Sequence, residues 1–150
     1  RRDVRGVRPR RGLHLMHGHP LHRGSMLPLA GIAPVGAAGG LERVIRVGSA
    51  GTCRVHAANA NAFIIDLRAN TTLSIAPVAD AFGVVSLTLV LVQDATGSRT
   101  VTWPASVDWG TAGAPTLTTT ASKADVVTFL TLNGGRSWYG FLSAKGFSSP

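Results

Sequence analysis

From residue 41 onward the sequence alternates apolar and polar side chains with a period of two, and no other feature constrains the fold as strongly. Short β-branched segments, among them residues 43–47, 62–67 and 126–132, are separated by clusters of glycine, asparagine or alanine. Alternation of this kind indicates β-strands, and no window beyond residue 41 has the spacing of an amphipathic helix of three turns. The pattern predicts an all-β domain over residues 41–150: a single antiparallel, jelly-roll-like β-sandwich with about eight or nine short strands.

The strand and turn signals predict individual connections. Residues 84–93, VVSLTLVLVQ, are nearly all apolar, which predicts a central strand covered on both faces. Residues 94–98, DATGS, predict a hairpin turn in which the Asp94 side chain caps the backbone and Gly97 takes a positive φ. The asparagine and two glycines at residues 133–135 predict a second hairpin.

The first 40 residues differ in composition from the rest. Residues 1–25 contain seven arginines and one aspartate, so they carry most of the net charge of +8. Residues 26–40, MLPLAGIAPVGAAGG, are apolar but interrupted by proline and glycine, which excludes a long regular helix. We predict an extended basic arm followed by a linker that lies along a protein surface. Only 15% of the chain is charged and 18 residues are glycine, and such a chain often hides surface in an assembly.

The arm and linker are the predicted attachment to a partner. Packaged DNA, an acidic membrane or an acidic groove of another protein could accept such an arm, and the adjoining apolar linker favours the protein groove. The arm lacks aromatic residues for base stacking, and no apolar stretch reaches the roughly 18 residues of a membrane span. We therefore expect neither nucleic acid nor a membrane as partner. The predicted docking residues are Arg1, Arg2, Arg5, Arg8, Arg10, Arg11, Leu27, Leu29 and Ile32.

Four histidines of the arm form the only metal-like cluster in the sequence. In an extended strand His17 and His19 project to the same side, so three chains around an axis could offer six nitrogens to one ion. The arm is irregular, however, and has no nearby carboxylates to orient these rings. We therefore predict surface or packing histidines, no bound metal and no cofactor. The cluster consists of His14, His17, His19 and His22.

No catalytic set is evident in the sequence, and we predict that the protein is not an enzyme. The acidic residues beyond the arm form no local pair, and most, Asp125 among them, are expected at strand ends or turns. A secreted hydrolase would need a pocket that gathers two aspartates with His56. The single cysteine, Cys53, lies in an alternating segment and is expected to be buried or half-buried rather than reactive.

Three aromatic residues are candidates for a ligand surface: Trp109, Trp138 and Tyr139. Adjacent residues of a strand face opposite sides, so only one of Trp138 and Tyr139 can lie in the core. The other faces outward, onto a subunit contact or a ligand. Tryptophan and tyrosine are also common core and rim residues with one polar group. We favour core and subunit contacts over ligand stacking for this set.

Residues 84–147 resemble a C-terminal module that is common in virion proteins of tailed bacteriophages, of the tail fibre, minor tail and appendage type. The matching segments are QDATGSRTVTWP, the stretch from Trp109 to Thr120, KADVVTFLTLNGG and WYGFLSAKGF. A looser similarity continues upstream through NAFIIDLRANTTLSI. Independently of the resemblance, Gly140 between two aromatic residues is expected to permit a close backbone approach or a bulge.

The resemblance implies an extracellular-facing β-sandwich that assembles with copies of itself or with other virion proteins, and it transfers no catalytic residue. Long fibre proteins place the module after a long shaft, whereas about 40 residues precede it here. We predict a structural protein of the virion, a homo-oligomer anchored by its N-terminal arm, as a capsid decoration or a small tail-associated component. The alternative is a receptor- or glycan-binding tip that contacts the host cell surface.

Overall fold

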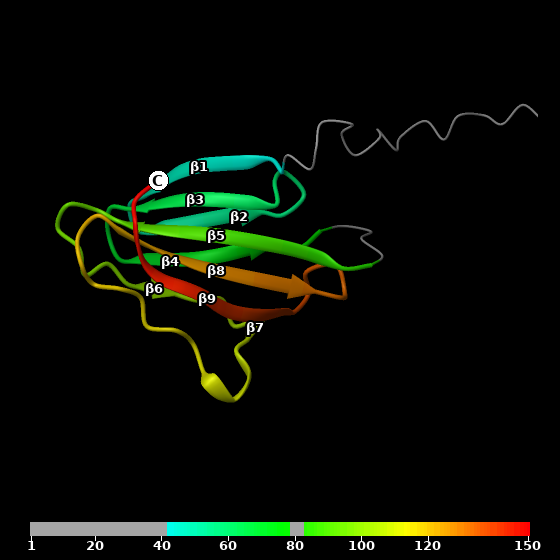
Figure 1. Cartoon of the computed structure of the whole chain (residues 1–150). Helices are drawn as coiled ribbons and strands as arrows, with labels where there is room; N and C mark the ends of the chain where they lie inside the picture. The colour runs from blue at the N-terminus through cyan, green and yellow to red at the C-terminus, as the bar shows by residue number, and fades with distance from the viewer. Residues whose placement is uncertain (1–41, 79–82) are drawn as a thin grey trace, which may run out of the picture. The chain divides into compact units, whose positions relative to one another are not determined.

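The computed structural model describes residues 42–78 and 83–150, which form nine strands and one short 3-10 helix (Figure 1). One sheet has the strand order β1-β3-β5-β8-β9-β7, and the other has the order β2-β4-β6. No helix among the described residues is long and apolar enough to span a membrane. The elements are β1 (Val44–Ser49), β2 (Thr52–His56), β3 (Ala62–Leu67), β4 (Thr71–Ala76), β5 (Val85–Gln93), β6 (Val101–Thr102), β7 (Val107–Asp108), η1 (Gly110–Ala112), β8 (Lys123–Thr131) and β9 (Trp138–Ser148).

The first six strands alternate between the two sheets. β1, β3 and β5 are parallel neighbours in the six-stranded sheet, and β2, β4 and β6 are parallel neighbours in the three-stranded sheet. The chain therefore winds as a coil, and each turn of the coil adds one parallel strand to each sheet. Gly51, with a φ of 126°, allows the tight turn from β1 to β2.

The last long strands extend the six-stranded sheet with antiparallel pairs. β8 pairs with β5, and β9 pairs with β8 across a connection in which Gly134 and Gly135 have positive φ. This connection confirms the hairpin predicted at residues 133–135. β7 pairs over two residues with the edge of β9 that faces away from β8, and it runs parallel to β9. The loop that carries η1 projects away from the sheet beside β9 (Figure 1).

The predicted all-β fold is confirmed, and the strand directions correct it in one respect. The six-stranded sheet is mixed and the three-stranded sheet is parallel, whereas the prediction is antiparallel throughout. Alternation and turn residues locate strands without giving their direction, and a chain that alternates between two sheets brings parallel strands together in each. The same topology places β5 and β6 in different sheets, so the connection at residues 94–98 is a turn between sheets and not a hairpin.

The turn after β5 is otherwise built as the sequence predicts. The Asp94 Oδ1 atom accepts hydrogen bonds from the N–H groups of Thr96 and Gly97 at 3.0 and 2.9 Å. Its Oδ2 atom pairs with Arg99 at 2.8 Å, and this hydrogen bond holds the pKa of Asp94 below its usual value. Gly97 has a φ of 73°, and a Cβ atom there would clash with the Thr119 carbonyl oxygen, so glycine is required.

The core lies between the two sheets. Cys53 of β2 is buried there as predicted, and burial raises the pKa of its thiol. β5 is central as predicted, but Ser86 is exposed and Val90 is only half-buried on the face away from the core. The prediction that both faces of this strand are covered is therefore wrong along most of its length. Large fully buried side chains include Trp138, Phe129, Ile65, Leu67, Leu87, Leu89 and Leu91.

Asp125 lies buried within β8 rather than in a turn, which corrects the expectation from the sequence. Its Oδ2 atom accepts a hydrogen bond from the Thr118 N–H at 2.6 Å, and its Oδ1 atom accepts from the Thr118 hydroxyl at 2.7 Å and the Gly146 N–H at 2.9 Å. Several donors of this kind make a buried carboxylate tolerable. Asp125 thus ties the loop before β8 to the end of β9.

Candidate functional site

The six-stranded sheet packs on the three-stranded sheet with one face. Its other face is uncovered by described residues over most of its extent, but at one end the C-terminal residues Phe147, Ser148 and Pro150 lie against it. Side chains alternate along each strand, and the strand registers align those of the uncovered face in rows across β1, β3, β5, β8 and β9. We call this surface the outer face. Its apolar residues are Val44, Ala62, Ile64, Val90, Val92, Ala124, Val126, Leu130, Tyr139, Phe141 and Phe147.

The centre of the outer face is apolar across three strands. Ile64 on β3, Val90 on β5 and Val126 on β8 are opposite one another in register and line a shallow hollow of about 390 Å³. Towards the edge of the face, Phe141 and Phe147 on β9 are 53% and 50% exposed. A contiguous apolar area of this kind marks a contact surface on a protein domain.

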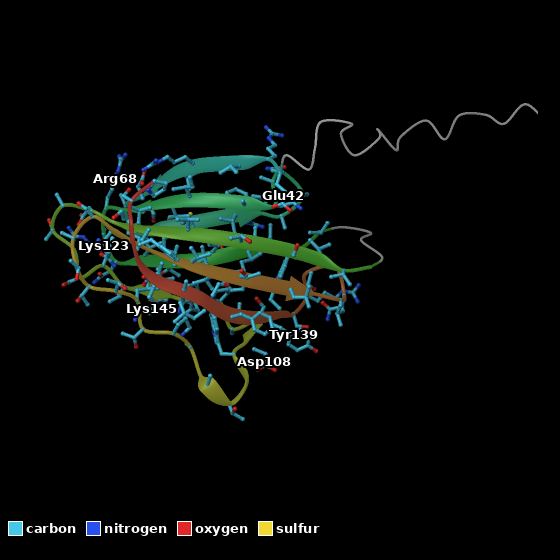
Figure 2. All side chains as sticks on the ribbon, in the orientation of Figure 1. Glu42, Arg68, Asp108, Lys123, Tyr139 and Lys145 are labelled. Carbon is cyan, nitrogen blue, oxygen red and sulfur yellow. The ribbon has the colours of Figure 1, made fainter. Side chains whose placement is uncertain are left out.

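The charged side chains of the outer face lie at one corner. Arg46 on β1 donates hydrogen bonds to both carboxylate oxygens of Asp66 on β3, at 2.8 and 3.0 Å, and these bonds raise the pKa of Arg46. The Arg68 guanidinium lies beside Gly48 at the end of β1 (Figure 2). The remaining rows of the face, from β5 to β9, carry no charged side chain.

A second candidate site is a groove between β9 and the loop that carries η1, with a volume of about 570 Å³. Asp108 and Tyr139, which are register partners on β7 and β9, lie close together at one end of it (Figure 2). The lining is mostly apolar, and Asp108 is its only charged residue among those described. The lining residues are Asp108, Trp109, Gly110, Ala112, Gly113, Pro115, Tyr139, Gly140, Phe141 and Leu142.

Trp109 is held in place at the groove by contacts with two other aromatic rings. It contacts Trp103 edge-on with 4.9 Å between ring centroids, and Phe129 with 5.7 Å. A Cβ atom on Gly140 would lie 2.6 Å from the Trp109 ring and 2.8 Å from Val107. Gly140 therefore allows the close approach that the sequence predicts, here between a strand backbone and an indole ring.

Gly140→Ala is expected to displace the Trp109 ring and to destabilise the domain by about 1–3 kcal/mol, as overpacking of a well-filled site does. Near-UV circular dichroism reports the ring contact between Trp103 and Trp109, and thermal unfolding reports the stability. Ser148→Ala, an exposed position on the same strand, is the control and should change neither signal. An unchanged spectrum and melting temperature for Gly140→Ala would show that Gly140 is not needed for the position of Trp109.

Two of the three predicted candidate aromatics line the groove. Trp109 is half-buried and Tyr139 is 47% exposed. Trp138, in contrast, is 1% exposed and donates its Nε1–H to the Gly135 carbonyl oxygen, so its prediction as a surface aromatic is wrong. The reason is the alternation of β9, which turns Trp138 into the core when Tyr139 faces outward. The expectation that only one of this adjacent pair is buried is confirmed.

Sequence reasoning missed Asp108, Phe141 and Leu142 as groove residues. The period of two could have identified Phe141, because it lies two residues after Tyr139 on the same side of β9. No local signal identifies Asp108, because its place depends on the parallel pairing of β7 with β9, between segments distant in the sequence.

The remaining predicted site residues lie outside the described part of the chain. They are the docking residues from Arg1 to Ile32 and the histidines from His14 to His22. Within residues 42–78 and 83–150, no three histidine, cysteine, aspartate or glutamate side chains gather as a metal site. His56 is exposed on β2 and does not line the groove, where Asp108 is the single described carboxylate.

The sequence of the described domain matches a known protein family. Residues 50–137 match the family described as "Putative phage tail fibre C-terminal domain", and this match spans more than half of the chain. It covers β2 to β8 and the loop with η1. No curated protein and no solved structure shows a significant match. The chain belongs to the family of phage tail fibre C-terminal domains, and it is a structural, tail-associated component of the virion.

Proposed function

We propose that the protein assembles in the tail with further copies of itself, which bury its outer face. Residues 1–40 attach it to other virion proteins. The observation that supports self-association is the half-buried apolar centre of the outer face, formed by Ile64, Val90 and Val126. Protein interfaces are depleted of charge at their centres and polar at their rims. The outer face has this distribution.

The size of the outer face suits such a contact. On β5 the face extends from Ser86 to Val92, which is about 20 Å at the usual rise per residue, and five strands at the usual spacing are about 19 Å wide. The area in plan is on the order of 400 Å², about half of the ~800 Å² of accessible surface that each partner contributes to a standard interface. The accessible surface of the face is larger than this flat estimate, because its side chains project from the sheet and its edges on β1 and β9 are exposed.

A copy of the same chain is the favoured occupant because of where the charges lie. In a symmetric contact, a residue near the symmetry axis lies close to the same residue of the other copy. A charged residue there would therefore repel its equivalent. The central rows carry no charge, and Arg46 and Asp66 at the corner already neutralise each other. Two such faces could pack as sheets do in a sandwich, about 10 Å apart. Self-association of the native chain, compared with that of a variant carrying charges in the central row, tests this contact.

Removal of residues 1–25 is expected to reduce incorporation of the protein into phage particles by about tenfold or more, because the proposed arginine contacts to virion proteins are then lost. The described domain should remain folded. Quantitative mass spectrometry of purified particles measures occupancy. A variant with all seven arginines of this segment changed to lysine keeps the charge but loses the paired hydrogen bonds, and should give an intermediate occupancy. Full occupancy without residues 1–25 would rule out the arm as an attachment.

A further inference from the structure

Among residues 42–78 and 83–150, no strand pairs with one edge of β9 over most of its length. β8 pairs with one edge along the whole strand, whereas β7 pairs with the other edge at Trp138 and Tyr139 alone. After Asp108 the chain leaves the sheet, and the groove occupies the place where further residues of β7 would lie. Figure 1 shows the departing loop beside β9. An unpaired strand edge is a template for pairing with another segment.

The pairing of β9 shows which backbone groups face the groove. The N–H of Trp138 donates to the carbonyl oxygen of Ser106 at 2.8 Å, on the β7 side of the strand. Groups that face one edge recur at every second residue, and the register with β8 is regular as far as Leu142. The carbonyl of Gly140 and the N–H and carbonyl of Leu142 therefore face the groove. In the described residues, no loop or side-chain hydrogen bond satisfies these three groups.

Two glycines direct the loop away from this edge. Gly110 and Gly113 have φ values of 58° and 71°, in the left-handed region, and a Cβ atom on either would meet no atom within 4 Å. Their identity therefore reflects the backbone conformation and not a lack of space. Further along, Lys145 on β9 donates a hydrogen bond to the carbonyl oxygen of Thr116, which brings the loop back to the strand. The unpaired edge of β9 thus extends from the short pairing with β7 to the hydrogen bond between Lys145 and Thr116.

We propose that this groove binds an extended peptide segment of another protein, which adds to β9 as a further strand. The edge from Tyr139 to Leu142 accommodates about four residues, or ~13 Å of extended chain. The groove volume of about 570 Å³ is within the range of protein ligand sites. An extended peptide presents N–H and C=O groups at the spacing that Gly140 and Leu142 require, and every second side chain enters the groove.

The lining defines which side chains such a peptide carries. Trp109 and Leu142 form an apolar surface on the core side of β9, and Tyr139 and Phe141 project from its other side. Asp108 adds one negative charge at the end of β7. The partner segment therefore has apolar residues at alternate positions and an arginine or lysine where it passes Asp108.

Amide hydrogen exchange of the full chain tests the unpaired edge without knowledge of the partner. The N–H of Phe141 faces β8, opposite Thr128, and is an internal control on the same strand. We expect the Leu142 N–H to exchange about tenfold faster or more than the Phe141 N–H in NMR-detected exchange. If the two amides are equally protected, the edge is already occupied and the proposal is wrong.

A blocked peptide of about six residues, alternating valine with threonine and containing one arginine, is the probe for binding. At saturation it should slow exchange of the Leu142 N–H about tenfold. The same peptide N-methylated at alternate amides keeps its side chains but cannot form the ladder, and should not protect Leu142. Phe141→Ser should weaken binding several-fold, whereas Phe147→Ser, on the same strand but outside the groove, should leave it unchanged.

The proposal is overturned if peptides of this type leave Leu142 unprotected, if the N-methylated peptide binds as tightly as the unmodified one, or if oligosaccharides alone shift the Gly140 and Leu142 resonances. Asp108→Asn should reduce affinity for the arginine peptide but not for its glutamine analogue, and equal losses would contradict the charge preference. These measurements concern the edge of β9. Phe141 belongs to both surfaces, but the exchange and peptide measurements leave Ile64, Val90 and Val126 unchanged, so their outcome does not decide whether copies associate through that central row.

Discussion

Replacing Trp138 with alanine is expected to lower the free energy of unfolding by about 3–5 kcal/mol. The Trp138 side chain is 1% exposed, and its Nε1–H donates to the Gly135 carbonyl oxygen at 3.1 Å. The substitution would leave a cavity between the two sheets and a carbonyl without its donor in the connection between β8 and β9. Urea denaturation followed by far-UV circular dichroism measures the change.

Leu132→Ala is the matched control, because Leu132 follows β8, is 58% exposed and lines neither the hollow nor the groove. Such a surface change should alter stability by no more than about 0.5 kcal/mol. If Trp138→Ala does not fold, Trp138→Phe retains most of the buried volume and should give a folded protein with a smaller loss. A loss for Trp138→Ala no larger than that for Leu132→Ala would contradict the placement of this indole in the core.

Introducing lysine at Ile64 and Val126 together is expected to weaken self-association by about 100-fold or more, because an unpaired charge buried at an interface costs ~3 kcal/mol or more. Both residues flank Val90 in the central row of the outer face. Neither belongs to the core between the sheets, so the domain should keep its fold. Sedimentation velocity measures the association, and circular dichroism checks the fold.

Thr119→Lys with Thr120→Lys is the control for this pair, because it adds the same charge to an exposed loop. The control variant should associate as the native chain does. If the Ile64 and Val126 variant also associates normally, the outer face is not the contact surface. If both variants lose association to the same extent, general charge repulsion explains the result, and the assignment to the outer face is equally contradicted.

The positions of the strands could be predicted from the sequence because they depend on local alternation. Residues 62–67 form β3 as predicted, and the Asp94 turn has the predicted cap and positive φ at Gly97. The strand directions could not be predicted in the same way. The turn at Asp94 has the residues of a hairpin but leads from one sheet to the other, and this depends on contacts between segments far apart in the sequence.

The candidate sites could be predicted only in part. Alternation on β9 predicts that one of Trp138 and Tyr139 is buried, but it does not say which, because that depends on the face that meets the three-stranded sheet. The groove depends on the short pairing of β7 with β9, which leaves Asp108 beside Tyr139. Gly140 was recognisable as a position of close approach, although the partner, Trp109, becomes evident only in the folded chain.

The mass of the unmodified 150-residue chain in solution tests most directly whether the outer face joins copies of the protein. Sedimentation equilibrium over a range of concentrations is the appropriate measurement. The proposed contact predicts a species of two or more times 15.6 kDa whose population falls on dilution. A single 15.6 kDa species at every concentration would contradict it.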